Sequence, residues 1–172
     1  RASSCCRRTF SVSSRLRCII QRSRKSQIMP LNPAGPDLSF FDDPPSSAEG
    51  VAEKWATSLG NYALTLTQVS VTVEAARPIL QTSLTAPLQT STDAATSFDA
   101  ALATFATTVA AGMAPAFVGV PPATPFSQVV FPPGTLYPDS ASAKSAIGAL
   151  IYSWFITGLA TPSVGGPSIP WS

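Results

Sequence analysis

The sequence contains no histidine, and its three cysteines, Cys5, Cys6 and Cys18, all precede residue 29. The lack of histidine excludes catalysis by imidazole, nucleophile pairs of the Ser-His and Cys-His kind, and nearly all catalytic zinc sites. The lack of cysteine after residue 28 excludes disulfides, thiol catalysis and iron–sulfur clusters from the rest of the chain. We therefore expect a protein that is not an enzyme, with no catalytic, metal-binding or cofactor-binding residues.

Charged residues are scarce and unevenly distributed. Residues 1–28 carry eight of the eleven basic residues and no acidic residue, for a net charge of +8. Residues 29–172, called the body below, carry the other three basic residues and all nine acidic ones, for a net charge of −6. Charged side chains make up roughly 8% of the body, against about 25% in an average domain. Such a surface is poorly soluble when bare, so we expect neighbouring subunits to cover much of it.

The basic segment 1–28 has three interpretations. Clustered arginines neutralise phosphates, which would make the segment a nucleic-acid-binding arm. A segment rich in Arg and Ser without acids is also typical of an organelle transit peptide. Alternatively, the segment lies outside the functional protein, which would then start at Met29. The abrupt change in cysteine, proline and charge at Met29 favours this last interpretation, and in each case we expect a disordered leader.

Apolar residues at helical spacing predict a mainly α fold, a small bundle of about three long helices with extended Pro-rich arms. The first helix is expected over residues 47–66, with Ser46 and Glu49 at the spacing of a capping box. The second is expected over about 91–112, and the third over about 139–158.

The stretch 67–90 supports two interpretations. Valines at positions 69, 71 and 73 alternate with polar residues, which is typical of a strand. The same residues could continue a helix as far as Arg77, and Pro78 and Pro87 interrupt whatever follows. The Ala-rich neighbouring segments favour the helix.

Proline-rich segments divide the body further. We expect an extended arm over 29–46, a helical domain over 47–160 that contains a second extended arm at 114–138, and an extended tail over 161–172. The second arm is too long for a turn and carries apolar anchors, so we expect it to lie across the helices or across a neighbouring subunit. Residues 127–131 could add a short strand at an edge.

Aromatic residues in these arms are the predicted contacts between subunits. They are Phe117, Phe126, Phe131, Tyr137 and Trp171. Trp55 and Trp154 instead lie within helical stripes, which favours packing in the core.

Three sets of polar residues invite a chemical interpretation. They are the acidic cluster Asp42, Asp43, Glu49 and Glu53, the pair Asp93 and Asp99, and the pair Ser140 and Lys144. The cluster has ligands suited to Mg²⁺ or Ca²⁺ but no EF-hand spacing. The two aspartates of the second set point to different sides of a helix, and a Ser-Lys nucleophile pair needs a buried lysine. We interpret all three sets as solvated surface groups.

Two uncharged segments, 100–119 and 146–160, raise the alternative of a small membrane protein. A spanning helix needs about 20 apolar residues. The second segment is shorter than that, and Gly112 and Pro115 interrupt the first. Neither has a basic flank to set its topology, so we favour helices buried in an assembly.

Four stretches of the body carry a resemblance to a known group of proteins. They are MPLNPAGP, WATSLGNYA, GMAPAFVGVPPATPF and ATPSVGGPSIPWS. Through them, residues 29–172 resemble the small Ala/Thr/Pro-rich structural proteins encoded among the virion genes of tailed bacteriophages. The resemblance implies a capsid- or tail-associated subunit in the virion, with copies of itself and other virion structural proteins as partners. The alternatives are a small membrane protein and a nucleic-acid-binding protein that acts through residues 1–28.

Overall fold

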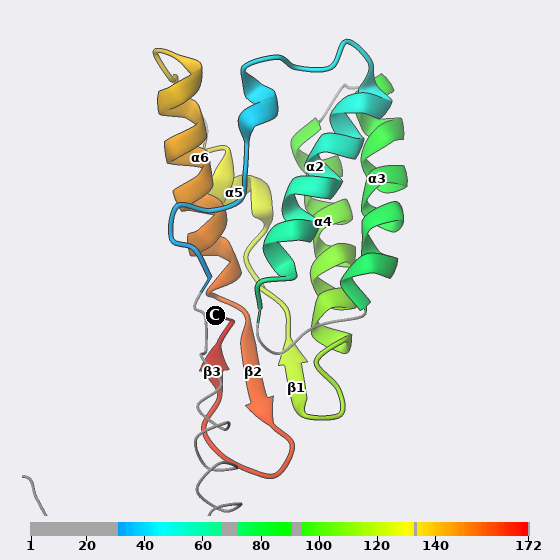
Figure 1. The fold of residues 1–172 in the computed structure, drawn as a ribbon, viewed down its shortest axis with the longest axis vertical. Coiled ribbons are helices and arrows are strands. Elements are labelled where there is room, and N and C mark those ends of the chain that lie inside the picture. Colours follow the sequence, from blue (N-terminus) through cyan, green and yellow to red (C-terminus); the bar gives the residue numbers. More distant parts are fainter. Residues whose placement is uncertain (1–30, 67–71, 91–93, 133, 172) are drawn as a thin grey trace, which may run out of the picture.

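The computed structural model describes residues 31–66, 72–90, 94–132 and 134–171. In these residues the chain is mainly helical, as predicted, with a small antiparallel sheet beyond one end of the helices (Figure 1). The elements in chain order are the 3-10 turn η1 (Ser39–Phe41), α2 (Ala48–Ala63), α3 (Thr72–Thr90), α4 (Ala94–Ala111), β1 (Phe117–Val120), α5 (Phe126–Val130), α6 (Ser140–Phe155), β2 (Leu159–Pro162) and β3 (Ile169–Pro170).

The helices are arranged in two groups. α3 packs against both α2 and α4, while α6 stands on the other side of the molecule and the short α5 packs against both α4 and α6 (Figure 1). The chain that precedes α2, blue in Figure 1, runs between α6 and α2. The described residues hold four helices of 16, 19, 18 and 16 residues, where the sequence predicted about three.

α2 begins where the sequence predicted, near Ser46 and Ser47, and Ser47 is its cap. Ser47 has the extended backbone of an N-cap, and its Oγ accepts a hydrogen bond from the Gly50 N–H at 3.1 Å. In a capping box, the acidic residue is the third residue of the helix. Because α2 starts at Ala48, its third residue is Gly50, so Ser46 and Glu49 do not form a capping box. The helix also ends at Ala63, earlier than the periodicity predicted.

α3 shows the helix that was favoured for the stretch 67–90, from Thr72 onward, while residues 67–71 lie outside the described part. Pro78 and Pro87 lie inside this helix although neither can donate a backbone hydrogen bond. The buried face of α3 consists of Val73, Ala76, Leu80 and Leu84. Packing of this face outweighs the two lost hydrogen bonds, because tertiary contacts supply most of the stability of a helix in a protein.

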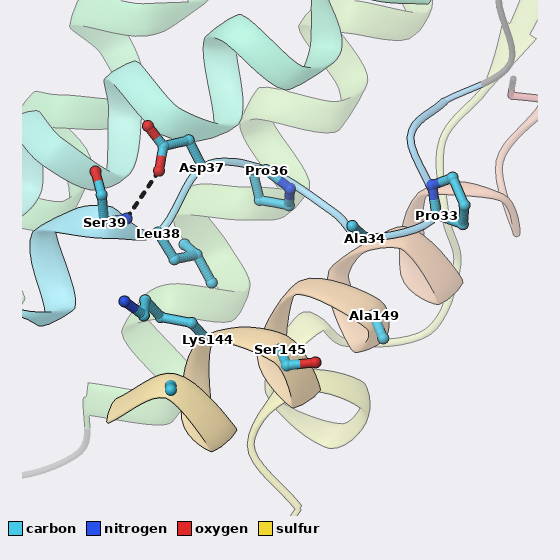
Figure 2. A pocket seen from close by; sticks show the side chains of 10 residues that line it. Pro33, Ala34, Pro36, Asp37, Leu38, Ser39, Lys144, Ser145 and Ala149 are labelled. Carbon is cyan, nitrogen blue, oxygen red and sulfur yellow. Dashed lines mark hydrogen bonds between the residues drawn. The ribbon is translucent and has the colours of Figure 1, made fainter. Parts of the chain in front are cut away.

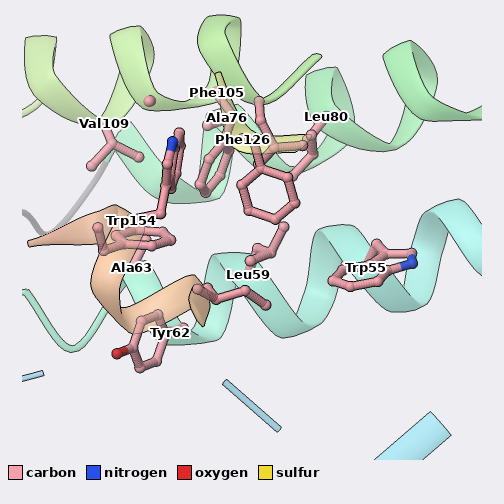
Figure 3. Packing of buried hydrophobic residues seen from close by; sticks show 14 of the residues in the cluster. Trp55, Leu59, Tyr62, Ala63, Ala76, Leu80, Phe105, Val109, Phe126 and Trp154 are labelled. Carbon is pink, nitrogen blue, oxygen red and sulfur yellow. The ribbon is translucent and has the colours of Figure 1, made fainter. Parts of the chain in front are cut away.

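The core is built from the facing sides of these helices and is rich in aromatic rings (Figure 3). Trp55 and Trp154 are both buried, which confirms that they pack in the core. The indole N–H of Trp154 donates to the carbonyl of Thr124 at 2.9 Å, and the Tyr62 hydroxyl donates to the carbonyl of Asn32 at 2.7 Å. Each polar tip reaches a backbone acceptor, which avoids the cost of a buried donor without a partner.

The described residues of the Pro-rich segment 114–138 pack onto the chain's own helices and include two short regular elements. They form β1 and then α5, from which Phe126 and Val130 enter the core. Residues 127–131, for which a short edge strand was one possibility, lie almost entirely in α5. The reason is packing that the local sequence does not encode, because the apolar side of this short helix fills the space between α4 and α6.

Asp99 holds α5 against α4. Its carboxylate accepts hydrogen bonds from the N–H of Ser127 at 2.6 Å and from the Ser127 hydroxyl at 2.7 Å. Asp99 is therefore a structural acceptor and not the solvated surface group that the sequence suggested. Asp93, with which it was paired in the sequence, lies outside the described residues.

The sheet has the order β1-β2-β3 and is antiparallel throughout. After β3 the chain ends its described course at Trp171, whose N–H donates to the Gly158 carbonyl and whose indole N–H donates to the Leu159 carbonyl, both at 3.0 Å. The tail is thus extended, and it closes one end of the core. Gly158 allows this contact, because a Cβ there would lie 2.5 Å from the indole ring.

Candidate interaction surfaces

The five aromatic residues predicted to contact other subunits differ in exposure. Phe126 and Trp171 are fully buried, so in this fold they contact the chain's own core instead of a neighbour. Phe117 and Tyr137 are partly buried against that core. Phe131 is 37% exposed, and its ring lies 6.0 Å from that of Phe126 in an edge-on arrangement. Phe126 and Phe131 lie together, but the five residues do not form one patch.

The sheet exposes an apolar face that the sequence did not reveal. Val118, Val120 and Leu159 are 61%, 48% and 40% exposed. The two valines lie on the same side of β1, and Val120 is the register partner of Leu159 on β2. We call these three side chains the outer sheet face. The sequence of β1, Phe-Val-Gly-Val, does not alternate apolar and polar residues and so gave no signal for an exposed face.

The opposite side of the sheet packs onto the helices. Gly119 lies so close to α4 that a Cβ there would be 2.5 Å from the Ala110 carbonyl oxygen. Ala160, its register partner on β2, is fully buried. The sheet is therefore fixed on one side only, and its outer face is left to solvent.

Two loops also present apolar side chains. Leu136 is 92% exposed and Val164 is 96% exposed. Val164 lies in the turn between β2 and β3, directly before Gly165 and Gly166, which have φ values of +88° and +144°. Glycine adopts such angles at little cost, so the turn holds its valine outward without strain in the following residues.

A second surface is formed by residues 31–43, which we call the strap. The strap crosses α6, and a cleft of about 580 Å³ lies between them (Figure 2). The cleft is lined by Pro33, Ala34, Pro36, Asp37, Leu38, Ser39, Ala141, Lys144, Ser145 and Ala149. Prolines and alanines make up half of this lining, and the Asp37 carboxylate accepts a hydrogen bond from the N–H of Ser39 at 2.9 Å.

The strap touches α6 backbone to backbone at a pair of glycines. A Cβ on Gly35 would lie 2.1 Å from the carbonyl oxygen of Gly148, and a Cβ on Gly148 would lie 2.3 Å from the carbonyl oxygen of Ala34. Gly35 also has a φ of +82°, which residues with a side chain rarely adopt. Both glycines are therefore needed for the backbone of the strap to pack this closely against the backbone of α6.

A latch of three side chains holds the far end of the strap. The carboxylate of Asp42 accepts hydrogen bonds from Lys144 Nζ at 2.5 Å and from Ser140 Oγ at 2.9 Å. These bonds, first that of Lys144 and then that of Ser140, hold the pKa of Asp42 below its ordinary value. The Ser140 and Lys144 side chains are thus both engaged with Asp42 and not with each other.

A smaller cleft of about 250 Å³ is lined by side chains of mixed charge, among them Asp37, Asp43 and Lys54. Across the described ranges, acidic side chains do not gather into a group of three or more that could hold a metal ion. Nor does any helix within those ranges have the length and apolar character needed to span a membrane.

These surfaces can bind by shape and apolar contact. The outer sheet face and the two loop residues offer apolar area, and the groove between α2 and α6 already holds an extended segment.

Comparison of the chain with protein-family models, with curated proteins and with solved structures yields no match.

Proposed function

We propose that this protein is a non-enzymatic structural subunit that packs into a symmetric assembly with copies of itself. We further propose that the assembly is a virion, in which the subunit is capsid- or tail-associated and also contacts other structural proteins. The observation that carries the proposal is the outer sheet face. Exposed neighbouring apolar side chains on a regular element are typical of a surface that another protein covers.

Two other observations support an assembly role. The body carries few charges, and the fully projecting Leu136 and Val164 add exposed apolar area outside the sheet. An isologous contact through the outer sheet face would place the same valines on both sides of a two-fold axis.

The experiment is a measurement of native mass by light scattering over a wide range of protein concentration. We expect the full chain to form oligomers, and a variant with Val118→Lys and Val120→Lys to shift toward the monomer. Ile79→Lys is the matched control, because Ile79 is 45% exposed but lies on α3, away from the sheet. A wild-type chain that stays monomeric at every concentration would contradict the proposal.

The virion part of the proposal has its own test. Purified particles are analysed by quantitative mass spectrometry for peptides of residues 29–172. We expect a fixed copy number per particle that survives washing in high salt. A protein that is present in infected cells but missing from purified particles would leave the assembly role standing and overturn the virion role.

A further inference from the structure

We draw no further inference here: the strongest candidate, the cleft of about 580 Å³ between the strap and α6, has charged lining groups that are already engaged within the chain, Asp37 by the N–H of Ser39 and Lys144 by Asp42, and nothing in the structure shows what covers it.

Discussion

The contact between Gly35 and Gly148 makes a quantitative prediction about stability. Gly35→Ala and Gly134→Ala place the same methyl group on backbones with nearly the same φ, +82° and +79°. At Gly134 nothing lies within 4 Å of the added Cβ, whereas at Gly35 the carbonyl oxygen, carbonyl carbon and Cα of Gly148 would lie at 2.1, 2.4 and 2.5 Å. The pair therefore separates the cost of the backbone angle from the cost of the contact.

The two costs differ in size. Holding an alanine in the left-handed region costs about 1–2 kcal/mol, and the stiffer unfolded chain returns about 0.4–1 kcal/mol of this. We therefore expect Gly134→Ala to lower the free energy of unfolding by about 1 kcal/mol. In Gly35→Ala the added methyl group must also push away the backbone of Gly148, and no side-chain rotation can relieve this clash. We therefore expect Gly35→Ala to lose about 1–3 kcal/mol more than Gly134→Ala.

The assay is urea unfolding followed by tryptophan fluorescence at a concentration where the protein is monomeric. Gly148→Ala is measured beside the first two variants. Alanine favours a helix interior by about 1 kcal/mol over glycine, so Gly148→Ala should stabilise α6 unless the strap stands in its way. Equal losses for Gly35→Ala and Gly134→Ala, or a gain for Gly148→Ala, would refute the close contact of strap and helix.

Three further outcomes are expected. The pKa of Asp42 is lowered in the folded state, so its carboxylate stabilises the fold at pH values above the ordinary pKa and loses this effect as the pH falls through the lowered pKa. The difference in urea midpoint between wild type and Asp42→Asn should therefore be present at pH 7 and vanish in acid. Phe126→Ala should cost about 3–5 kcal/mol of unfolding free energy because it empties a buried site, while Phe131→Ala should cost less because that ring is partly exposed; equal costs would contradict the placement of α5. On the nucleic-acid alternative, deletion of residues 1–28 removes binding to DNA or RNA together with its salt dependence, and unchanged binding after the deletion would exclude that alternative.

The helices were largely predictable because their signals are local. Trp55 and Leu59 recur at helical spacing, and a cap followed by an apolar stripe indicated α6 from Asp139 onward. The structure places Asp139 as the N-cap, with its carboxylate accepting from the N–H of Ser142 at 2.7 Å. Interactions of this kind span one or two turns, and spacing in the sequence is enough to find them.

The strap, the latch and the placement of α5 could not be predicted in the same way. Asp42 and Lys144 are 102 residues apart, and Asp99 and Ser127 are 28 residues apart. An aromatic residue such as Phe126 in a Pro-rich segment indicates that its side chain is buried. Its position in the sequence does not say whether it is buried in the core of its own chain or in that of a neighbouring subunit. Pairing at such distances depends on the whole packing arrangement, which local propensity does not determine.

The three tryptophans of the chain have different neighbours in the core, although Trp154 and Trp171 both contact the ring of Phe155, and this makes them optical probes of the fold. Trp55 lies against Phe40 and Phe41 of the strap, Trp154 lies 5.1 Å from the ring of Phe126 on α5, and Trp171 closes the core at the sheet. Variants that retain one tryptophan each would report on a different region of the same molecule. Departure of the strap would then change the emission of Trp55 most, because Phe40 and Phe41 lie edge-on to that indole.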